Sequence, residues 1–180
     1  MQLLLKACHA IDRINVFVGR SVSWLVLVAV LVSAGNAVSR KLFSASSNAW
    51  LELQWYLFSA VFLLAAGYTL FLGEHVKIDI IYGRLKRRTQ IWIEVFGTLF
   101  FLFPFVAISF WLTLPQAIRR IENGEVSNNA GGLLLWPVWI LIPIGFGLLG
   151  LQGVSELVKR LGFLAGRYPD PGAERPAAPH

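Results

Sequence analysis

Four long stretches without any charged residue divide the chain. Each has roughly the 18–20 residues that an α-helix needs to cross a hydrocarbon layer of about 30 Å. Their apolar runs are continuous, whereas a membrane β-barrel would alternate apolar and polar positions. The pattern therefore predicts an all-α integral membrane protein with four transmembrane helices. The expected spans are 21–39, 50–73, 91–115 and 134–157.

Three features refine this outline. In residues 1–15, apolar positions recur at spacings of three and four, which fits either an interfacial amphipathic helix or an N-terminal extension of the first span. Pro104 lies near the middle of the third span and predicts a kink, because proline lacks the backbone N–H. We expect residues 1–166 to form a single domain, and the proline-rich segment 167–180 to be a disordered cytoplasmic tail.

Composition and charge placement support a membrane protein with a definite orientation. Of the 180 residues, 56% are hydrophobic and 14% are charged, against about 25% charged in typical soluble domains. Among the basic residues, twelve fall on one side of the predicted spans: Lys6, Arg13, Arg20, Lys77, Arg84, Lys86, Arg87, Arg88, Lys159, Arg160, Arg167 and Arg175. The other side has four: Arg40, Lys41, Arg119 and Arg120. The positive-inside rule then places both termini and the loop between the second and third spans in the cytoplasm of a multi-pass membrane protein.

Residues suited to catalysis, cofactor binding or nucleic-acid binding are missing from the expected places. His9 and His180 are close to the termini and His75 lies at a span edge, so no histidine pair is placed to hold a haem inside the bundle. Cys8 is the only cysteine, which excludes an internal dithiol. The basic residues lie in loops, whereas nucleic-acid binding needs a basic face on a soluble domain. We expect neither an enzyme nor a metal site, cofactor or nucleic-acid partner.

The acidic residues nearest to the membrane are Glu52 and Glu94, each in the first turn of a predicted span. An acid there interacts favourably with the helix dipole, so both are expected to remain hydrated at the interface. Polar residues within the spans, such as Gln152, are expected to hydrogen-bond between helices. No ionisable residue falls at the centre of a span, which argues against a carrier that works by itself.

Small residues on the second and fourth spans could allow another backbone to approach closely. They are Ala65, Ala66 and Gly67, and a stripe of Gly147, Gly150 and Gly153 at every third position. Packing within the bundle and docking of another subunit explain these residues equally well.

The segment 73–88, GEHVKIDIIYGRLKRR, connects the second and third spans. Gly73 can end the second helix, and Asp79 can cap a short segment that lies in the cytoplasmic interface. His75 could pair with Asp79 across one helical turn. Lys86, Arg87 and Arg88 could then contact anionic phospholipid head groups. The alternative is a solvated loop between two spans.

Several motifs together resemble a known family. The second span, WLELQWYLFSAVFLLAAGYTL, is followed by EHVKIDIIYGRL. The third span is followed by GEVSNNAGGLLLWPVWILIPIGFGLLGLQGVSEL, which contains the fourth span. This combination resembles the small membrane subunit, DctQ-like, of tripartite ATP-independent periplasmic (TRAP) transporters. The GEVS sequence and the W-P helix are nearest to the branch labelled mannitol/chloroaromatic, which includes transporters of 2-oxo acids.

The resemblance implies a division of labour. A periplasmic binding protein captures an organic anion, and a large DctM-like subunit carries the substrate and sodium sites in an elevator mechanism. The small subunit is a multi-pass protein of the bacterial inner membrane that belongs to the static scaffold and does not bind substrate. We expect Glu52, Gln54 and Trp55 to form the periplasmic end of the joint. Cytoplasmic anchoring would fall to His75, Asp79, Arg84, Lys86, Arg87 and Arg88, and the small-residue faces would pack on a subunit or lipid.

A protein of a different class also fits the four spans. It would be a free-standing four-helix membrane protein that acts as an assembly factor or a small exporter. The two hypotheses differ in whether a larger membrane protein accompanies this chain.

Overall fold

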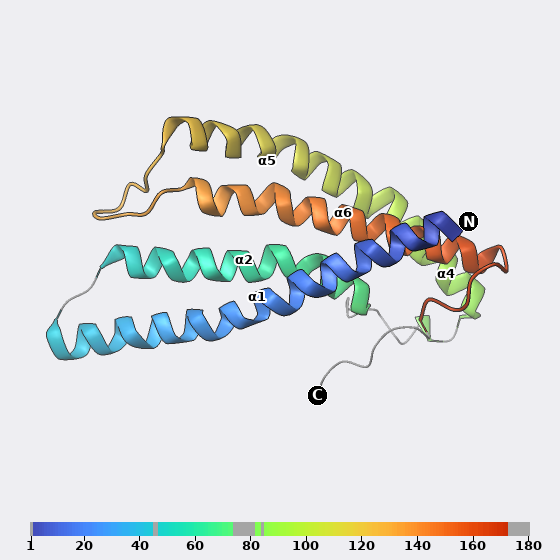
Figure 1. Ribbon diagram of the computed structural model, residues 1–180, viewed down its shortest axis with the longest axis horizontal. Helices are drawn as coiled ribbons and strands as arrows, with labels where there is room; N and C mark the ends of the chain where they lie inside the picture. Colours follow the sequence, from blue (N-terminus) through green and yellow to red (C-terminus); the bar gives the residue numbers. More distant parts are fainter. Residues whose placement is uncertain (1, 45–46, 74–81, 84, 173–180) are drawn as a thin grey trace.

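The computed structural model describes residues 2–44, 47–73, 82–83 and 85–172. Four long helical rods, each apolar enough to cross a membrane, form within these residues. In the view of Figure 1 they lie side by side in the order α5, α6, α2 and α1, and α1 crosses over α6 near its N-terminal end. All-helical architecture with four membrane-length helices is thereby confirmed. We call the end with the start of α1, α4 and the end of α6 the cytoplasmic end, following the predicted orientation, and the opposite end the periplasmic end.

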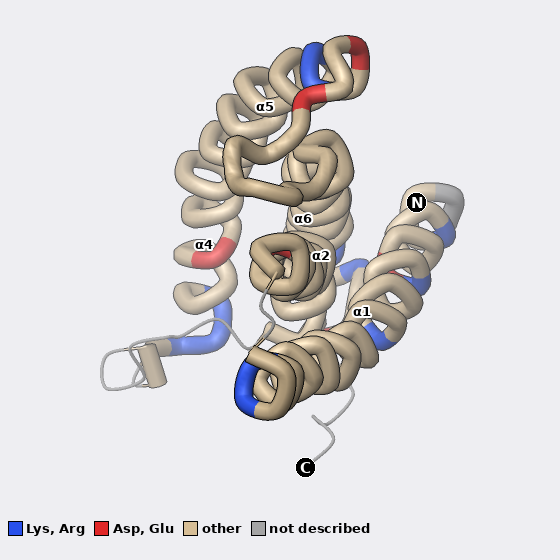
Figure 2. Tube along the Cα trace, turned by 90° about the vertical axis from the view of Figure 1, so that its left-hand side faces the viewer, with Lys and Arg blue, Asp and Glu red and all other residues tan. Residues whose placement is uncertain are grey.

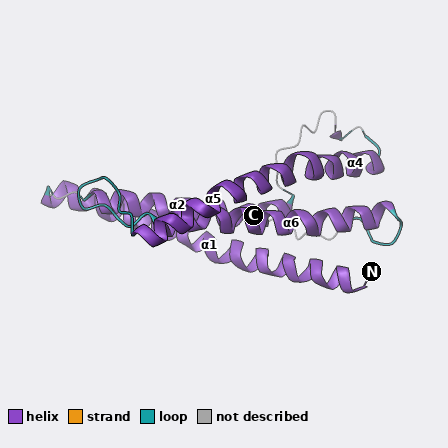
Figure 3. Ribbon diagram, turned by 90° about the horizontal axis from the view of Figure 1, so that it is seen from above, coloured by secondary structure: helices purple, strands orange, loops and turns teal. Residues whose placement is uncertain are grey.

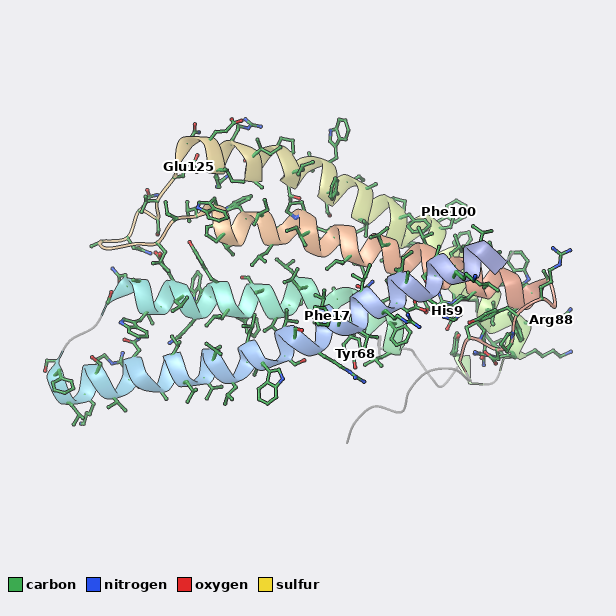
Figure 4. All side chains as sticks on the ribbon, viewed as in Figure 1. His9, Phe17, Tyr68, Arg88, Phe100 and Glu125 are labelled. Atoms are coloured by element: carbon green, nitrogen blue, oxygen red, sulfur yellow. The ribbon has the colours of Figure 1, made fainter. Side chains whose placement is uncertain are left out.

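The first rod is a single helix, α1 (Gln2–Phe43), so the N-terminal residues extend the first span and do not form a separate interfacial helix. α1 packs along α2 and, near the cytoplasmic end, also against α6. Gly19 makes the crossing with α2 possible, because a Cβ atom at this position would overlap the side chain of Tyr68. Figure 4 shows Phe17 and Tyr68 near this crossing.

The second rod is α2 (Asn48–Leu72), and both of its ends are capped by local chemistry. The Ser47 side chain accepts a hydrogen bond from the backbone N–H of Ala49 at the start. Gly73 ends the helix in the left-handed conformation, with φ of 72°, and its N–H bonds to the carbonyls of Thr69 and Leu70. The predicted role of Gly73 as the end of this helix is confirmed.

The third rod combines α4 (Arg87–Gly97), the π-helical turn η1 (Thr98–Leu102) and α5 (Phe103–Asn123). The wider turn lies directly before Pro104, whose missing N–H leaves a carbonyl of the preceding turn without its helical partner. Such π-turns are a recognised cause of bending in helices. In the view of Figure 3 the rod bends between α4 and α5, at the place where the sequence predicts a kink.

The fourth rod is α6 (Trp136–Leu164), and it is the central helix of the bundle. It contacts α1, α2, α4 and α5. One third (33%) of its most apolar window is buried, against 11% in each of the other three rods. Leu70, Val106 and Leu149 form the small apolar core where α2, α5 and α6 meet. The other rods therefore keep most of their apolar side chains on the outside, as expected for contact with lipid or with a partner.

Candidate functional site

A buried cluster of charged side chains joins α1 to α6 at the cytoplasmic end. Asp12 is 7% exposed and its Oδ2 lies 2.5 Å from the Nζ of Lys159, which is 5% exposed. The other oxygen, Oδ1, accepts hydrogen bonds from Gln152 Nε2 at 2.9 Å and Ser155 Oγ at 2.8 Å. Asp12 therefore has a cation and two neutral donors, which together offset the cost of removing its charge from water.

The same cluster continues to α4 through a second basic residue. Arg160 Nε lies 2.9 Å from Glu94 Oε2, and Arg160 Nη2 lies 3.1 Å from Glu156 Oε2. Tyr82 donates a hydrogen bond of 2.5 Å to Glu94 Oε1. Burial, and then this hydrogen bond, raise the pKa of Tyr82 above its ordinary value, so its hydroxyl keeps the proton that it donates. The charged cluster thus connects α1, α6 and α4.

Asn15 extends the cluster towards α2. Its Nδ2 donates to Gln152 Oε1 at 3.0 Å and to the carbonyl of Ile11 at 3.2 Å. Its Oδ1 is buried without a conventional donor and rests on Gly67, where a Cβ atom would overlap it. The Cα–H groups of glycine can donate weakly to such an oxygen. Gly67 is thus required for close packing of α2 against α1 within this chain.

Sequence reasoning missed the charged cluster for two reasons. It placed Lys159 and Arg160 in a loop after a helix ending near Leu157, whereas α6 continues to Leu164 and turns both side chains inward. It also singled out the apolar positions of the N-terminal segment and did not consider a face that packs on other helices. The face that packs on the bundle instead contains Cys8, Asp12, Asn15, Gly19 and Val22. A usable signal was present, because Gln152, Ser155, Glu156 and Lys159 repeat at helical spacing on one face.

A second polar site lies at the periplasmic end, around Glu52. The Glu52 carboxylate accepts hydrogen bonds from Ser127 Oγ, from Asn129 Nδ2 at 2.7 Å and from the backbone N–H of Leu133 at 2.7 Å. All three donors belong to the loop between α5 and α6. Tyr56 adds a hydrogen bond of 2.9 Å from its hydroxyl to the carbonyl of Leu134. One turn of α2 therefore holds this loop against the bundle.

The expectation of hydrated acids at the span ends is wrong for both Glu52 and Glu94. Glu52 is 9% exposed, and the side chain of Glu94 is 13% exposed. Glu52 binds Ser127, 75 residues further along the chain, and Glu94 binds Arg160, 66 residues further along. Local helix chemistry cannot predict contacts between residues so far apart in the sequence. The predicted hydrogen bonding of Gln152 between helices is confirmed, since it bonds to both Asp12 and Asn15.

The glycine stripe of α6 faces α5 of the same chain. A Cβ atom at Gly150 would lie 3.0 Å from Val106, and one at Gly153 would lie 3.0 Å from Leu102 and 3.1 Å from Phe103. Gly147 has more room, with the Phe110 ring at 3.8 Å from such a Cβ atom. The sequence left open whether these glycines pack within the bundle or dock another subunit, and the contacts correspond to packing within the bundle. Ala66 likewise packs on the apolar core, and Ala65 accepts the hydroxyl hydrogen bond of Thr69.

Gln54 and Trp55 lie on the outer surface, at a groove between α1 and α2. The groove has a volume of about 690 Å³, and Val26, Val30 and Phe58 form its apolar walls. Trp55 is 76% exposed. Gln54 and Ser33 also line the groove, so polar side chains face an otherwise apolar surface. In a membrane, such side chains are suited to hydrogen bonds with a neighbouring helix.

The predicted cytoplasmic anchor is only partly described. His75, Asp79 and Arg84 lie outside the described residues. Lys86 and Arg88 are exposed at the start of α4, and Figure 4 shows Arg88 at the edge of the molecule. Arg87 instead forms a bidentate pair with Asp170, at 2.7 Å and 2.5 Å. Asp170 belongs to the first part of the predicted tail, of which residues 167–172 are described and the rest lies outside the described residues.

The comparisons with known proteins place the chain in a family. Residues 22–162 match the family model described as "Tripartite ATP-independent periplasmic transporters, DctQ component". The chain belongs to the DctQ family. No curated protein and no solved structure matched. This DctQ component is thus a multi-pass protein of the inner membrane, it belongs to a transporter family and not to an enzyme family, and its partners are other components of a TRAP transporter.

Within the residues that the structure describes, no group of three or more histidine, cysteine or acidic side chains could hold a metal ion. The polar chemistry of the DctQ component lies in the two sites at its ends. Figure 2, which looks along the rods, shows that Lys, Arg, Asp and Glu occupy only a few positions of the helices. One site connects α1, α4 and α6, and the other connects α2 to the loop between α5 and α6, so the arrangement is suited to holding a shape.

Proposed function

We propose that this DctQ component is the static scaffold of a sodium-coupled TRAP transporter and does not itself bind substrate. A periplasmic binding protein would deliver an organic anion of the carboxylate or 2-oxo-acid type. The transporter would be nearest to the mannitol/chloroaromatic branch of the family. The large DctM-like subunit would carry substrate and sodium and would move as an elevator against this scaffold. The substrate class follows from the GEVS and W-P sequence features alone.

The observation that supports the proposal is that the buried charged side chains are paired within the chain. Among the described residues, each buried charged side chain binds a group of the same chain: Asp12, Glu52, Glu156, Lys159 and Arg160. A carrier needs ionisable groups that remain available to an ion or solute at membrane depth. Paired charges that connect α1, α4 and α6 at one end, and a carboxylate that holds a loop at the other, favour a rigid body.

The groove between α1 and α2 is the surface that we assign to the large subunit. Its exposed Trp55 and its polar Gln54 and Ser33 would contact a helix that is itself polar at that depth. The other expected interface positions, Gly150 and Gly153, are covered by α5. Gln54 and Trp55 therefore support the joint better than the glycine stripe does.

Co-purification and uptake test this proposal together. The tagged chain should recover a larger membrane protein from detergent extracts. Vesicles that contain both membrane components and the binding protein should take up a labelled 2-oxo acid only with an inward sodium gradient. Accumulation of solute by this chain alone in vesicles would contradict the scaffold role.

Variants of exposed tryptophans test the assigned surface. Trp55→Ala should reduce recovery of the large subunit by roughly tenfold, since exposed aromatic residues often dominate interfaces. Trp111→Ala is the matched control, because Trp111 is 79% exposed but lies on α5. Equal losses in the two variants, or a loss confined to Trp111→Ala, would remove the α1–α2 groove from the interface.

A further inference from the structure

A cleft with a basic edge lies on α1, beside the buried cluster. It has a volume of about 640 Å³ and is lined by His9, Arg13, Phe17 and Arg20 of α1, Phe71 of α2 and Lys159 of α6, among others. The four α1 residues follow at spacings of four, four and three, so they form one stripe along the helix. In Figure 4, His9 and Phe17 both lie in the N-terminal half of α1. We call this site the α1 cleft.

The acidic side chains of the α1 cleft are paired within the protein, whereas two of its basic side chains are unpaired among the described residues. Asp12 and Glu156 also line it, but Asp12 is bound to Lys159, and Glu156 lies 3.1 Å from Arg160. Arg13 and Arg20 are exposed, and no hydrogen bond or ion pair joins either of them to another residue in the part of the chain that the structure describes. The carboxylates are neutralised inside the protein, whereas two guanidinium groups remain available at the mouth. The site is therefore complementary to an anion.

The geometry suits a phosphate group that carries an apolar body. Arg13 and Arg20 are two helical turns apart, about 10 Å along the axis. Guanidinium groups bind phosphate oxygens through paired N–H donors. Phe17 is 73% exposed between them, and Val16 and Phe71 continue the apolar lining. A small soluble anion would leave these apolar side chains in water, but a lipid would cover them.

The position along the chain agrees with a lipid ligand. Arg20 immediately precedes the uncharged stretch 21–39, so it falls where the first span reaches the membrane surface. Arg13 lies on the cytoplasmic side of Arg20, in the region of the head groups. We propose that the α1 cleft binds the phosphodiester head group of an anionic phospholipid, with Arg13 and Arg20 as its ligands. This site differs from the basic segment Lys86–Arg88 and does not depend on the function proposed above.

Native mass spectrometry of the full-length chain, purified with its membrane partner, tests the site. After removal of lipid, the complex is titrated with dioleoyl phosphatidylglycerol and with dioleoyl phosphatidylcholine, which share the same acyl chains. The unmodified chain should prefer phosphatidylglycerol. The Arg13→Gln/Arg20→Gln double variant should lose roughly fivefold of this preference for each arginine, about 25-fold in total.

Two controls separate the cleft from general attraction between a basic protein and an anionic lipid. Lys6→Gln/Arg167→Gln removes the same charge from exposed positions on the same side, outside both the cleft and the predicted anchor, and it should keep the preference of the unmodified chain. Arg13→Lys/Arg20→Lys keeps the charge and should restore part of the preference. The Arg13→Gln/Arg20→Gln variant should have the same melting temperature as the unmodified chain, because the exposed arginines are not needed for folding.

Four outcomes would overturn the proposal. The double variant could retain the full preference, or the control pair could lose as much as the cleft pair. Glycerol 3-phosphate or inorganic phosphate could bind as tightly as phosphatidylglycerol, which would indicate a soluble anion. The double variant could instead lose the membrane partner without any change in lipid preference, which would assign the arginines to a protein contact. Recovery of the partner is measured separately, so failure of the lipid site is distinguishable from failure of the scaffold role.

Discussion

The two polar ends of the molecule hold helices together by different means. At the cytoplasmic end, Asp12, Lys159, Arg160 and Glu94 form pairs of opposite charge between three helices. At the periplasmic end, the single carboxylate of Glu52 binds neutral donors of one loop. Removing one partner of a buried ion pair leaves the other charge unpaired, whereas neutral donors at a loop can turn to water. The cytoplasmic end should therefore be the more sensitive to substitution.

The largest effect is expected for Asp12→Asn. It leaves the buried ammonium group of Lys159 with only the more distant carboxylate of Glu156, at 3.9 Å, which should lower the free energy of unfolding by about 3 kcal/mol. Thermal unfolding of the purified chain in detergent measures this. Asp170→Asn is the matched control, because it removes a carboxylate from the Arg87 pair, whose side chains are 39% and 33% exposed, and should cost at most about 1 kcal/mol. Equal losses would show that burial of the Asp12 pair has no special importance.

Glu52→Gln should have a smaller global effect than Asp12→Asn. The amide nitrogen of glutamine would face the donors of Ser127, Asn129 or Leu133, so part of the loop is released. Hydrogen exchange of residues 124–135 should become about tenfold faster, while exchange of the buried cluster at the cytoplasmic end stays unchanged. Faster exchange throughout the bundle would mean that the two ends are one cooperative unit.

Gly67→Ala should destabilise the contact between α1 and α2 by about 1–3 kcal/mol, because the added methyl group overlaps Asn15 Oδ1 and lies 3.2 Å from the carbonyl of Leu148. Gly35→Ala is the control. Gly35 is in α1, with no atom within 4 Å of an added Cβ, so this change should be neutral or stabilising by at most about 1 kcal/mol. Chemical unfolding of both variants compares the positions. Similar stability of the two would show that Gly67 is not needed for close packing.

Tyr82→Phe should have the smallest effect, about 1 kcal/mol, from loss of the hydrogen bond to Glu94. The pKa of Tyr82 is raised above its ordinary value of 10.0, so its contribution is fully present below about pH 10 and is lost as the pH rises through the raised pKa. Stability of the unmodified chain should therefore fall more steeply above pH 10 than that of Tyr82→Phe. If the stability of the two proteins changed with pH in the same way, the hydrogen bond from Tyr82 to Glu94 would not contribute to the cluster.

Sequence alone determined the four helices, because a run of about 20 uncharged apolar residues has one stable arrangement in lipid. It also gave the end of α2 at Gly73 and the kink before Pro104, since both depend on local backbone chemistry. The family followed from sequence motifs and agrees with the match over residues 22–162.

Only the tertiary structure decided which polar residues are buried and what they bind. Asp12 and Lys159 are 147 residues apart, and Glu52 and Leu133 are 81 apart. Local patterns classified all of these as interfacial or loop residues, because hydropathy describes a residue's neighbours along the chain and not those across a helix interface. The length of α6 beyond Leu157 and the rotation of α1 about its own axis brought the charges together. Pairing between distant segments, which no single helix encodes, made their burial stable.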